Sequence, residues 1–261
     1  MKQIKRLFYA LAGVPVIAVL AWAVAVPTDL IEERIKGAVV QSHRGMLSLA
    51  VSGLKKGLLF SLHADGLELS IDSRPALTVT NVSGRFSPRS LLRGKLGFPI
   101  IGKIGGGDVH GFAEYPGEGQ VTITGAELSA IPYLSRFGMD IRGSLNSRIT
   151  ITGAAMNMTF HVPDLMIDDS ASLIPLLNTF RSLQGALSVA GNRITIESIS
   201  LEGDKGYARL KGDIVNNVMN LTLELMPEAN RLNATESMII GKYAVSPGYY
   251  VVPIRGPVPQ P

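Results

Sequence analysis

The sequence predicts a mainly β protein, in which one N-terminal transmembrane helix precedes a long, curved antiparallel sheet with two or three short helices. Three observations support this fold class: an uncharged apolar run of bilayer length, apolar residues that alternate with polar ones from Met46 onward, and turn residues between the alternating runs. Such strands present one apolar face and one face that meets water.

The apolar run Leu7–Val26 contains no charged residue, and Lys2, Lys5 and Arg6 precede it. A helix of this length covers about 30 Å, the hydrocarbon thickness of a bilayer. Basic residues favour the cytoplasmic side of a membrane, so we expect a cytoplasmic stub at residues 1–6 and an exported chain after the helix. A cleaved signal peptide is the alternative interpretation, and it exports the same residues.

The composition suits an exported protein that has one sizeable core. The chain has 261 residues, of which 46% are hydrophobic and 18% are charged, and it contains no cysteine. The absence of cysteine excludes disulfides, cysteine-based zinc sites and a thiol nucleophile. The net charge of +4 is modest, and no basic stripe is interleaved with aromatic residues, so we expect no nucleic-acid partner.

Residues 27–45 are expected to form a stalk helix or linker. Asp29 and Glu32 have the spacing of a capping box, and apolar residues follow at roughly helical intervals. Residues 46–250 are expected to form the β-rich exported domain, and residues 251–261 a C-terminal tail.

Alternation with a period of two residues predicts half-buried strands in the β-rich region. The clearest runs are at residues 47–52, 67–72, 77–81, 121–124, 149–152, 194–197 and 221–225. Turn residues separate them, including Asp65-Gly66, Pro116-Gly117, residues 202–206 and Asn216-Asn217. The glycines of residues 102–107 are in the wrong order for a phosphate-binding loop and instead indicate a tight bend.

Three segments are predicted as short helices within the sheet. Residues 87–94 have Ser87 as N-cap, Pro88 in the first turn and Gly94 after the end. Residues 173–183 carry leucines at helical spacing, and residues 129–138 form a weaker candidate.

Several polar residues could carry chemistry, and each has a simpler structural interpretation. His63 with Asp65, and Asp108 with His110, would share a strand face and could bind a metal or pair as base and orienting group. A metal site needs further ligands and a triad needs a nucleophile, and the sequence indicates neither. The alternative is that these are solvated strand residues.

Two further sets of polar residues also have a simpler structural interpretation. The acidic residues could serve glycoside hydrolysis, but no aromatic platform for a sugar accompanies them. These residues are Asp164, Asp168 and Asp169. Four asparagines begin glycosylation triplets, and chance occurrence explains those that lie within strands. They are Asn81, Asn157, Asn220 and Asn233. We therefore assign no catalytic, cofactor-binding or metal-binding residue.

The chain resembles the type II secretion system protein N family (GspN) and, more distantly, periplasm-facing AsmA-like proteins. The resemblance rests on the basic stub with its anchor, on the capped segment 87–94, on the glycine-rich run 105–111 and on the apolar end Val251–Pro257. The closing Gly-Pro departs from the usual Gly-Thr type of ending. The resemblance implies a single-pass inner-membrane protein with most of the chain in the periplasm and no enzymatic activity. It also implies that the antiparallel sheet is long, curved and open, with the form of a half-barrel or groove.

Two functions follow from this resemblance. The first is a non-enzymatic component of the type II secretion system, which would bind other secretion proteins. The second is a lipid-binding or lipid-transfer protein of the cell envelope, in which apolar residues such as Leu221 and Leu223 line a groove. An exported hydrolase, acting through His63, His110 or Asp168, is a minor alternative.

Overall fold

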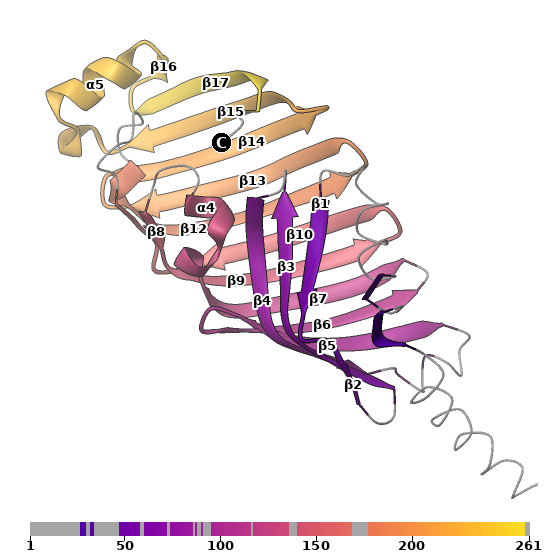
Figure 1. Cartoon of the computed structure of the whole chain (residues 1–261). Helices are drawn as coiled ribbons and strands as arrows, with labels where there is room; N and C mark the ends of the chain where they lie inside the picture. The colour runs from indigo at the N-terminus through magenta and orange to yellow at the C-terminus, as the bar shows by residue number, and fades with distance from the viewer. Residues whose placement is uncertain are drawn as a thin grey trace, which may run out of the picture. The chain divides into compact units, whose positions relative to one another are not determined.

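The computed structural model describes residues 27–29, 32–33, 47–57, 60–71, 74–85, 87, 90, 95–115, 117–135, 140–168 and 177–258. These residues form a mainly β structure, and the strands pair antiparallel in an open sheet (Figure 1). The mainly β and antiparallel character predicted from the alternation is therefore confirmed, and so is the expectation of an open sheet. Six of the seven clearest alternating runs lie wholly in strands, and the described part of the seventh, residues 67–71, lies in a strand as well.

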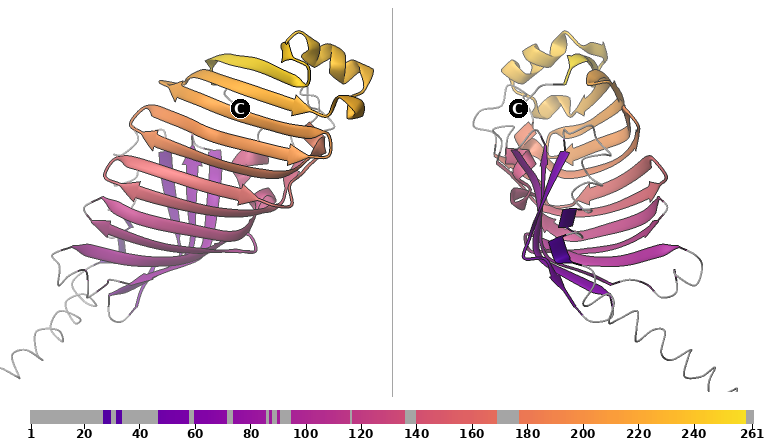
Figure 2. Two further views of the ribbon diagram at one scale, coloured as in Figure 1. Left: turned by 180° about the vertical axis from the view of Figure 1, so that it is seen from behind. Right: turned by 45° about the vertical axis from the view of Figure 1, so that its right-hand side comes forward.

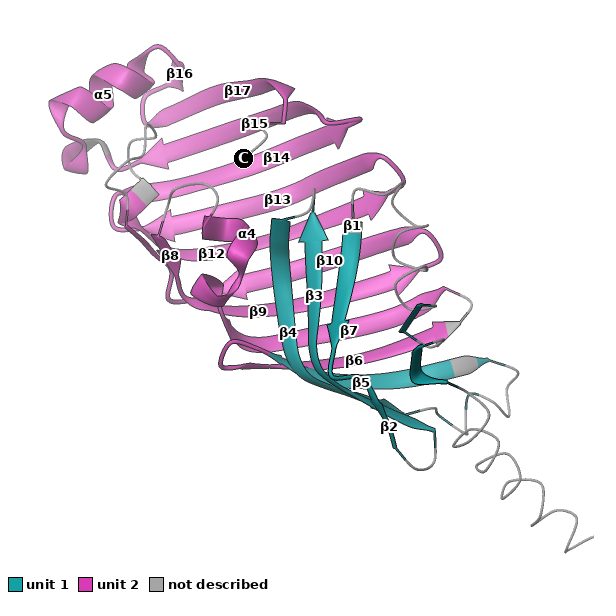
Figure 3. Ribbon diagram, viewed as in Figure 1, with its two compact units in different colours: residues 1–103 teal, residues 104–261 magenta. Residues whose placement is uncertain are grey.

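The chain divides into two compact units, residues 1–103 (unit 1) and residues 104–261 (unit 2), as Figure 3 shows. Unit 1 has the strand order β1-β3-β4-β5, and β2 pairs with β3 beside β1. The last residue of β5 belongs to unit 2. The strands of unit 1 are β1 (Leu47–Ser52), β2 (Lys55–Lys56), β3 (Ser61–Ile71), β4 (Arg74–Arg85) and β5 (Leu96–Ile104).

Unit 2 is a ladder of antiparallel strands in nearly sequential order, β6-β7-β9-β10-β12-β13-β14-β15-β17-β16. Figure 2 shows this ladder from two further sides, with its strands bent along their length. The strands are β6 (Gly107–Tyr115), β7 (Glu118–Glu127), β9 (Ser144–Thr152), β10 (Ala155–Val162), β12 (Phe180–Ala190), β13 (Arg193–Gly203), β14 (Gly206–Val215), β15 (Val218–Pro227), β16 (Ala244–Ser246) and β17 (Tyr249–Pro257).

Short elements connect the strands of unit 2. β8 (Asp140–Arg142) and β11 (Met166–Asp168) pair as a separate two-stranded sheet. The other elements are the 3-10 helices η1 (Leu128–Ala130), η2 (Leu177–Thr179) and η3 (Ala229–Arg231) and the α-helices α4 (Pro132–Ser135) and α5 (Ala234–Gly241). Some of the most deeply buried side chains of unit 2 lie close to these elements, namely Ala126 near the end of β7, Val162 at the end of β10 and Leu165 just before β11.

A capping box begins α5. The Asn233 side chain accepts a hydrogen bond from the Glu236 amide at 2.7 Å, and the Glu236 carboxylate accepts one from the Asn233 amide at 2.8 Å. Lys205 also donates to Glu236, at 2.6 Å. The helix is therefore capped at its first turn and held to the β13–β14 turn.

The helix predictions are confirmed only in part. The described part of residues 129–138 holds the end of η1 and α4. The prediction for residues 173–183 is wrong beyond η2, because β12 begins at Phe180. A register shift between Phe180 and Ser182 lets Phe180 and Leu183, which have helical spacing, both serve a strand. Only Ser87 and Ser90 of the 87–94 segment are described, and the Ser90 amide donates to Ser87 as an N-cap requires.

Two other local predictions are wrong. Asp65-Gly66 is not a turn, because β3 runs through it and Gly66 pairs with both Ser52 and Thr80. Ladder pairing on both sides outweighs the turn preference of this dipeptide. Residues 251–257 are not a tail, because they form most of β17 and pair with β15.

The predicted anchor Leu7–Val26 lies outside the described residues, as does most of the predicted stalk. Thr28, Asp29, Glu32 and Glu33 of the stalk are helical. Among the described residues, no helix has the length and apolar character needed to cross a membrane.

Close packing at Gly107 gives a test of the unit 2 ladder. A Cβ at this position would lie 2.3 Å from the backbone nitrogen of Ala126, whereas a Cβ on Gly241 would meet nothing within 4 Å. We expect Gly107→Ala to lower the free energy of unfolding by about 1–3 kcal/mol, because backbone must move. Gly241→Ala, the matched control, should be neutral or slightly stabilising. Equal effects of the two substitutions in urea denaturation would contradict this packing.

Candidate apolar binding face

The strand register of unit 2 aligns apolar side chains across the whole ladder. Residues that pair directly in adjacent strands point to the same face of a sheet. One continuous row crosses from β7 to β17 and consists of Val121, Ile149, Met158, Leu187, Ile196, Gly212, Leu221 and Ile254. This row shows that eight strands contribute an apolar residue or a glycine to one face.

Parallel rows extend this surface on both sides of the first one. We call it the apolar face. Its larger members are Val109, Val121, Ile123, Ile149, Ile151, Met156, Met158, Phe160, Leu183, Leu187, Val189, Ile194, Ile196, Ile199, Leu201, Leu210, Ile214, Met219, Leu221, Leu223, Leu225, Val252 and Ile254.

Charged groups do not interrupt the apolar face. Among its described and paired residues, only Ser147 and Tyr250 carry a polar side-chain atom. The Ser147 hydroxyl donates to the Thr159 carbonyl at 3.0 Å, so its donor is satisfied within the sheet. A ligand on this face would therefore meet almost no hydrogen-bonding group.

Two β-bulges preserve the apolar face where the sequence alternation changes phase. In β13 the apolar spacing widens from two residues to three between Ile196 and Ile199, and the register shifts at that point. The extra residue returns Ile199 to the apolar face. In β7 a similar shift between Ile123 and Ala126 uses Gly125 at φ +67°, whose amide donates to the Asn146 side chain at 3.1 Å.

Most side chains of the apolar face are half-buried. A few are buried, including Leu221 at 6% exposure and Ile196 at 7%, whereas Ile151 is 37% exposed. A finished protein core would bury nearly all of them. The face thus keeps accessible apolar surface over many strands.

The opposite face of the ladder is polar and bonded across strands. Thr195 donates to Asp213 at 2.7 Å, and the Ser200 and Tyr207 hydroxyls lie 2.7 Å apart. The Lys211 ammonium lies 2.5 Å from the Glu224 carboxylate. These pairs, which join β13 to β14 and β14 to β15, help hold the register of the apolar residues behind them.

The His and Asp residues considered as candidate metal ligands or catalytic groups do not come together in one site. His63 and Asp65 share a face of β3, 3.8 Å apart and both about half exposed. Asp108 and His110 are exposed on β6. Asp164 accepts hydrogen bonds from the Ser144 amide and hydroxyl at 2.8 and 3.1 Å, and the amide bond lowers the pKa of its carboxyl.

Asp168 lies on β11, and Asp169 is outside the described residues. Of the glycosylation-type asparagines, Asn157 and Asn220 lie within strands and Asn233 caps α5. Asn81 lies in β4 with φ +51°. Within the described ranges, no three His, Asp or Glu residues group closely enough to hold a metal ion.

Comparison of the chain with protein-family models, with curated proteins and with solved structures gave no match.

The Lys211–Glu224 pair makes stability depend on pH. The Lys211 ammonium is the main reason that the pKa of Glu224 lies below its usual value of 4.5. A lowered folded-state pKa stabilises the protein above the unfolded value, and this contribution is lost as the pH falls through the folded value. We expect Lys211→Met to be less stable than wild type at pH 7. The gap should close at an acidic pH below the folded-state pKa of Glu224, where the carboxyl is protonated in both proteins.

Arg255→Met serves as the control in urea denaturation at both pH values, because it removes the same charge from an exposed position. A stability gap for Lys211→Met that is the same at both pH values would contradict the ion-pair argument.

Proposed function

We propose that the protein is a non-enzymatic lipid-binding or lipid-transfer component of the cell envelope, in which the apolar face of unit 2 holds acyl chains in a groove. The observation that carries this proposal is the uninterrupted apolar face, built from β6 to β17 and only half-buried.

The dimensions of the face suit acyl chains. Nine strands spaced by about 4.8 Å give a surface about 40 Å long. The hydrocarbon core of a bilayer is about 30 Å thick and holds two layers of acyl chains. The face is thus longer than a single acyl chain, and the strands that build it are bent along their length (Figure 2).

The chemistry of the face also favours an acyl chain over a polar ligand. Each methylene group buried contributes about 0.8 kcal/mol, so ten methylenes suffice in principle for micromolar binding. A polar ligand would instead leave its own hydrogen-bonding groups unpaired against this surface. An apolar patch of this extent on a protein commonly marks a binding surface.

The type II secretion role implied by the resemblance stays a prediction, and so do the inner-membrane location and the hydrolase alternative. A secretion partner could bind by adding a strand to the outer edge of β17, but the residues on this edge do not favour such pairing. The Val251 amide already donates to the Tyr243 carbonyl. Pro253 and Pro257 lie further along the same edge and have no amide hydrogen to donate. Proline and the charged Arg255 are typical of an edge protected from pairing.

Photo-crosslinking tests the binding face directly. A photoreactive phenylalanine analogue would replace Ile151, on the apolar face, in the full-length chain within its own membrane. We expect ultraviolet irradiation to yield a lipid-sized mass adduct at this position, because the side chain is 37% exposed among apolar neighbours. The same analogue at Thr150, the exposed neighbour on the polar face, should give at least fivefold less. Equal lipid labelling at both positions would argue against a binding face.

A charge placed on the apolar face provides an independent test. The sequence singled out both Leu221 and Leu223, but Leu221 is only 6% exposed, so a charge there would report on folding. We therefore expect Leu223→Asp, at a half-buried position, to lower retained lipid about tenfold in native mass spectrometry of the full chain, since a carboxylate opposes acyl contact.

Thr222→Asp puts the same charge on the opposite face and should retain lipid. A matched thermal unfolding measurement separates loss of binding from loss of fold. The proposal fails if folded Leu223→Asp carries as much lipid as Thr222→Asp.

A further inference from the structure

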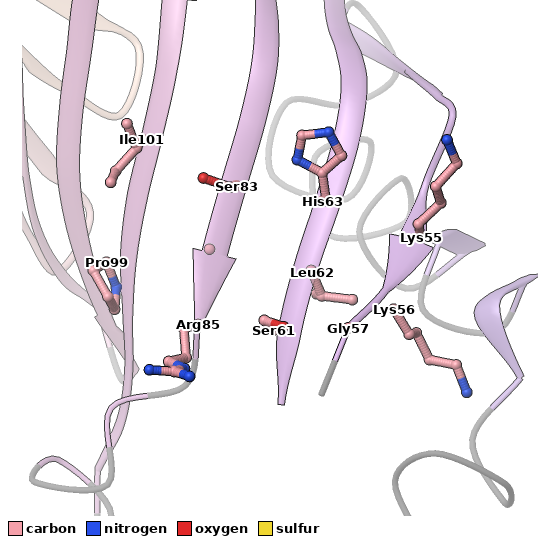
Figure 4. Close-up of a pocket in the computed structure, with 11 residues that line it drawn as sticks. Lys55, Lys56, Gly57, Ser61, Leu62, His63, Ser83, Arg85, Pro99 and Ile101 are labelled. Carbon is pink, nitrogen blue, oxygen red and sulfur yellow. The ribbon is translucent and has the colours of Figure 1, made fainter. Parts of the chain in front are cut away.

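A second candidate site lies in unit 1, where β2, β3, β4 and β5 line a pocket of about 490 Å³. Figure 4 shows how the pocket residues lie on these neighbouring strands. The register pairs Lys55 with His63, His63 with Ser83, and Ser83 with Ile101. Arg85 is two residues beyond Ser83 on the same face of β4. Four segments thus converge on one surface.

The pocket is basic. Lys55, Lys56 and Arg85 line it beside His63, and the described residues of its lining include no Asp or Glu. The neighbouring Asp65 is 59% exposed and lies 3.8 Å from the His63 ring. In the part of the chain that the structure describes, neither Lys55 nor Arg85 forms an ion pair. The positive charges of Lys55 and Arg85 around the concavity favour an anionic ligand.

The spacing of the cations fits a group as small as a phosphate. Lys55 and Ser83 are two strands apart, about 10 Å, and Arg85 is about 7 Å further along β4. The side chains of Lys55 and Arg85 are long and flexible, so both can reach one anion that lies between them. Arginine offers paired donors to phosphate oxygens, and lysine adds a mobile point charge.

Apolar groups adjoin the cationic pocket. Leu62, Pro99 and Ile101 contribute to its wall, and Ile101 is 51% exposed. The pocket face of β3 continues into Leu67 and Leu69. The residues paired with these two are also apolar, namely Val51, Val79, Leu49 and Leu77. One face of unit 1 therefore carries basic residues at one end and apolar residues at the other, with the exposed Asp65 between them on β3. The two ends match the headgroup and the acyl chain of an anionic lipid.

Apart from the His63 ring, the described residues that line the pocket offer no aromatic ring for base stacking, whereas a nucleic-acid channel usually presents several. We propose that the unit 1 pocket binds the phosphate group of an anionic phospholipid, with Lys55 and Arg85 as its principal contacts. This assignment deepens the proposed function by naming the headgroup class, and it rests on that function for the acyl part.

Native mass spectrometry of the full chain in a non-ionic detergent tests the assignment. Phosphatidylglycerol and phosphatidylcholine with identical acyl chains would be added in equal amounts, and the ratio of their adducts measured. We expect wild type to prefer phosphatidylglycerol, and Lys55→Gln with Arg85→Gln to reduce the preference about tenfold or more, since each basic group contributes to anionic-lipid binding. Arg193→Gln with Arg255→Gln, which removes two exposed charges from unit 2, is the control and should keep the preference.

The outcomes separate this proposal from its alternatives. An unchanged phosphatidylglycerol preference in the pocket variant overturns it. Adduct formation with inorganic phosphate, without a lipid preference, reassigns the pocket to free phosphate, and retention of an added oligonucleotide instead of lipid reassigns it to nucleic acid. Failure of the proposed function appears differently, as loss of total lipid adducts of both classes, whereas failure of the pocket changes only their ratio.

Discussion

The organisation of unit 2 depends on one constraint: each strand must keep its apolar side chains on the same face as those of its neighbours. A slip of one residue would move the whole apolar set of that strand to the polar face. The antiparallel register meets this requirement from β6 to β17, and the bulges at Gly125 and Glu197 correct the phase where the apolar spacing widens. Cross-strand pairs on the polar face, such as Thr195–Asp213, support the same register.

Because the apolar side chains of all these strands lie on one face, unit 2 has a large apolar surface that could bind a ligand. An ordinary sheet packs its apolar face into a core, whereas most of the larger side chains here stay half-buried. Leaving such a surface in water is unfavourable, at about 25 cal/mol for each Å² of apolar area, so an apolar occupant would stabilise the ladder as well as bind to it. Retention of lipid and stability of the fold are therefore expected to be coupled.

The two units carry complementary chemistry. Unit 2 offers a long surface nearly without hydrogen-bonding groups, and unit 1 offers a pocket whose charged lining residues are all basic. An acyl chain suits the former, and a phosphate group suits the latter. The polar residues first considered for catalysis have structural partners or are exposed: Asp164 holds the start of β9, and Asp108 and His110 lie on the polar face of β6.

The sequence by itself determined the β class, the positions of the main strands and the membership of Leu221 and Leu223 in one face. Alternation is a local property, so it can be read without knowing which strands pair. The bulges also left a signal, the three-residue gaps after Ile123 and Ile196. Only the tertiary structure decided that Phe180–Leu183 is a strand, that Asp65-Gly66 continues β3, and that Lys55, His63 and Arg85 line one pocket. These outcomes depend on hydrogen-bond partners from other segments of the chain, and local spacing does not specify those partners.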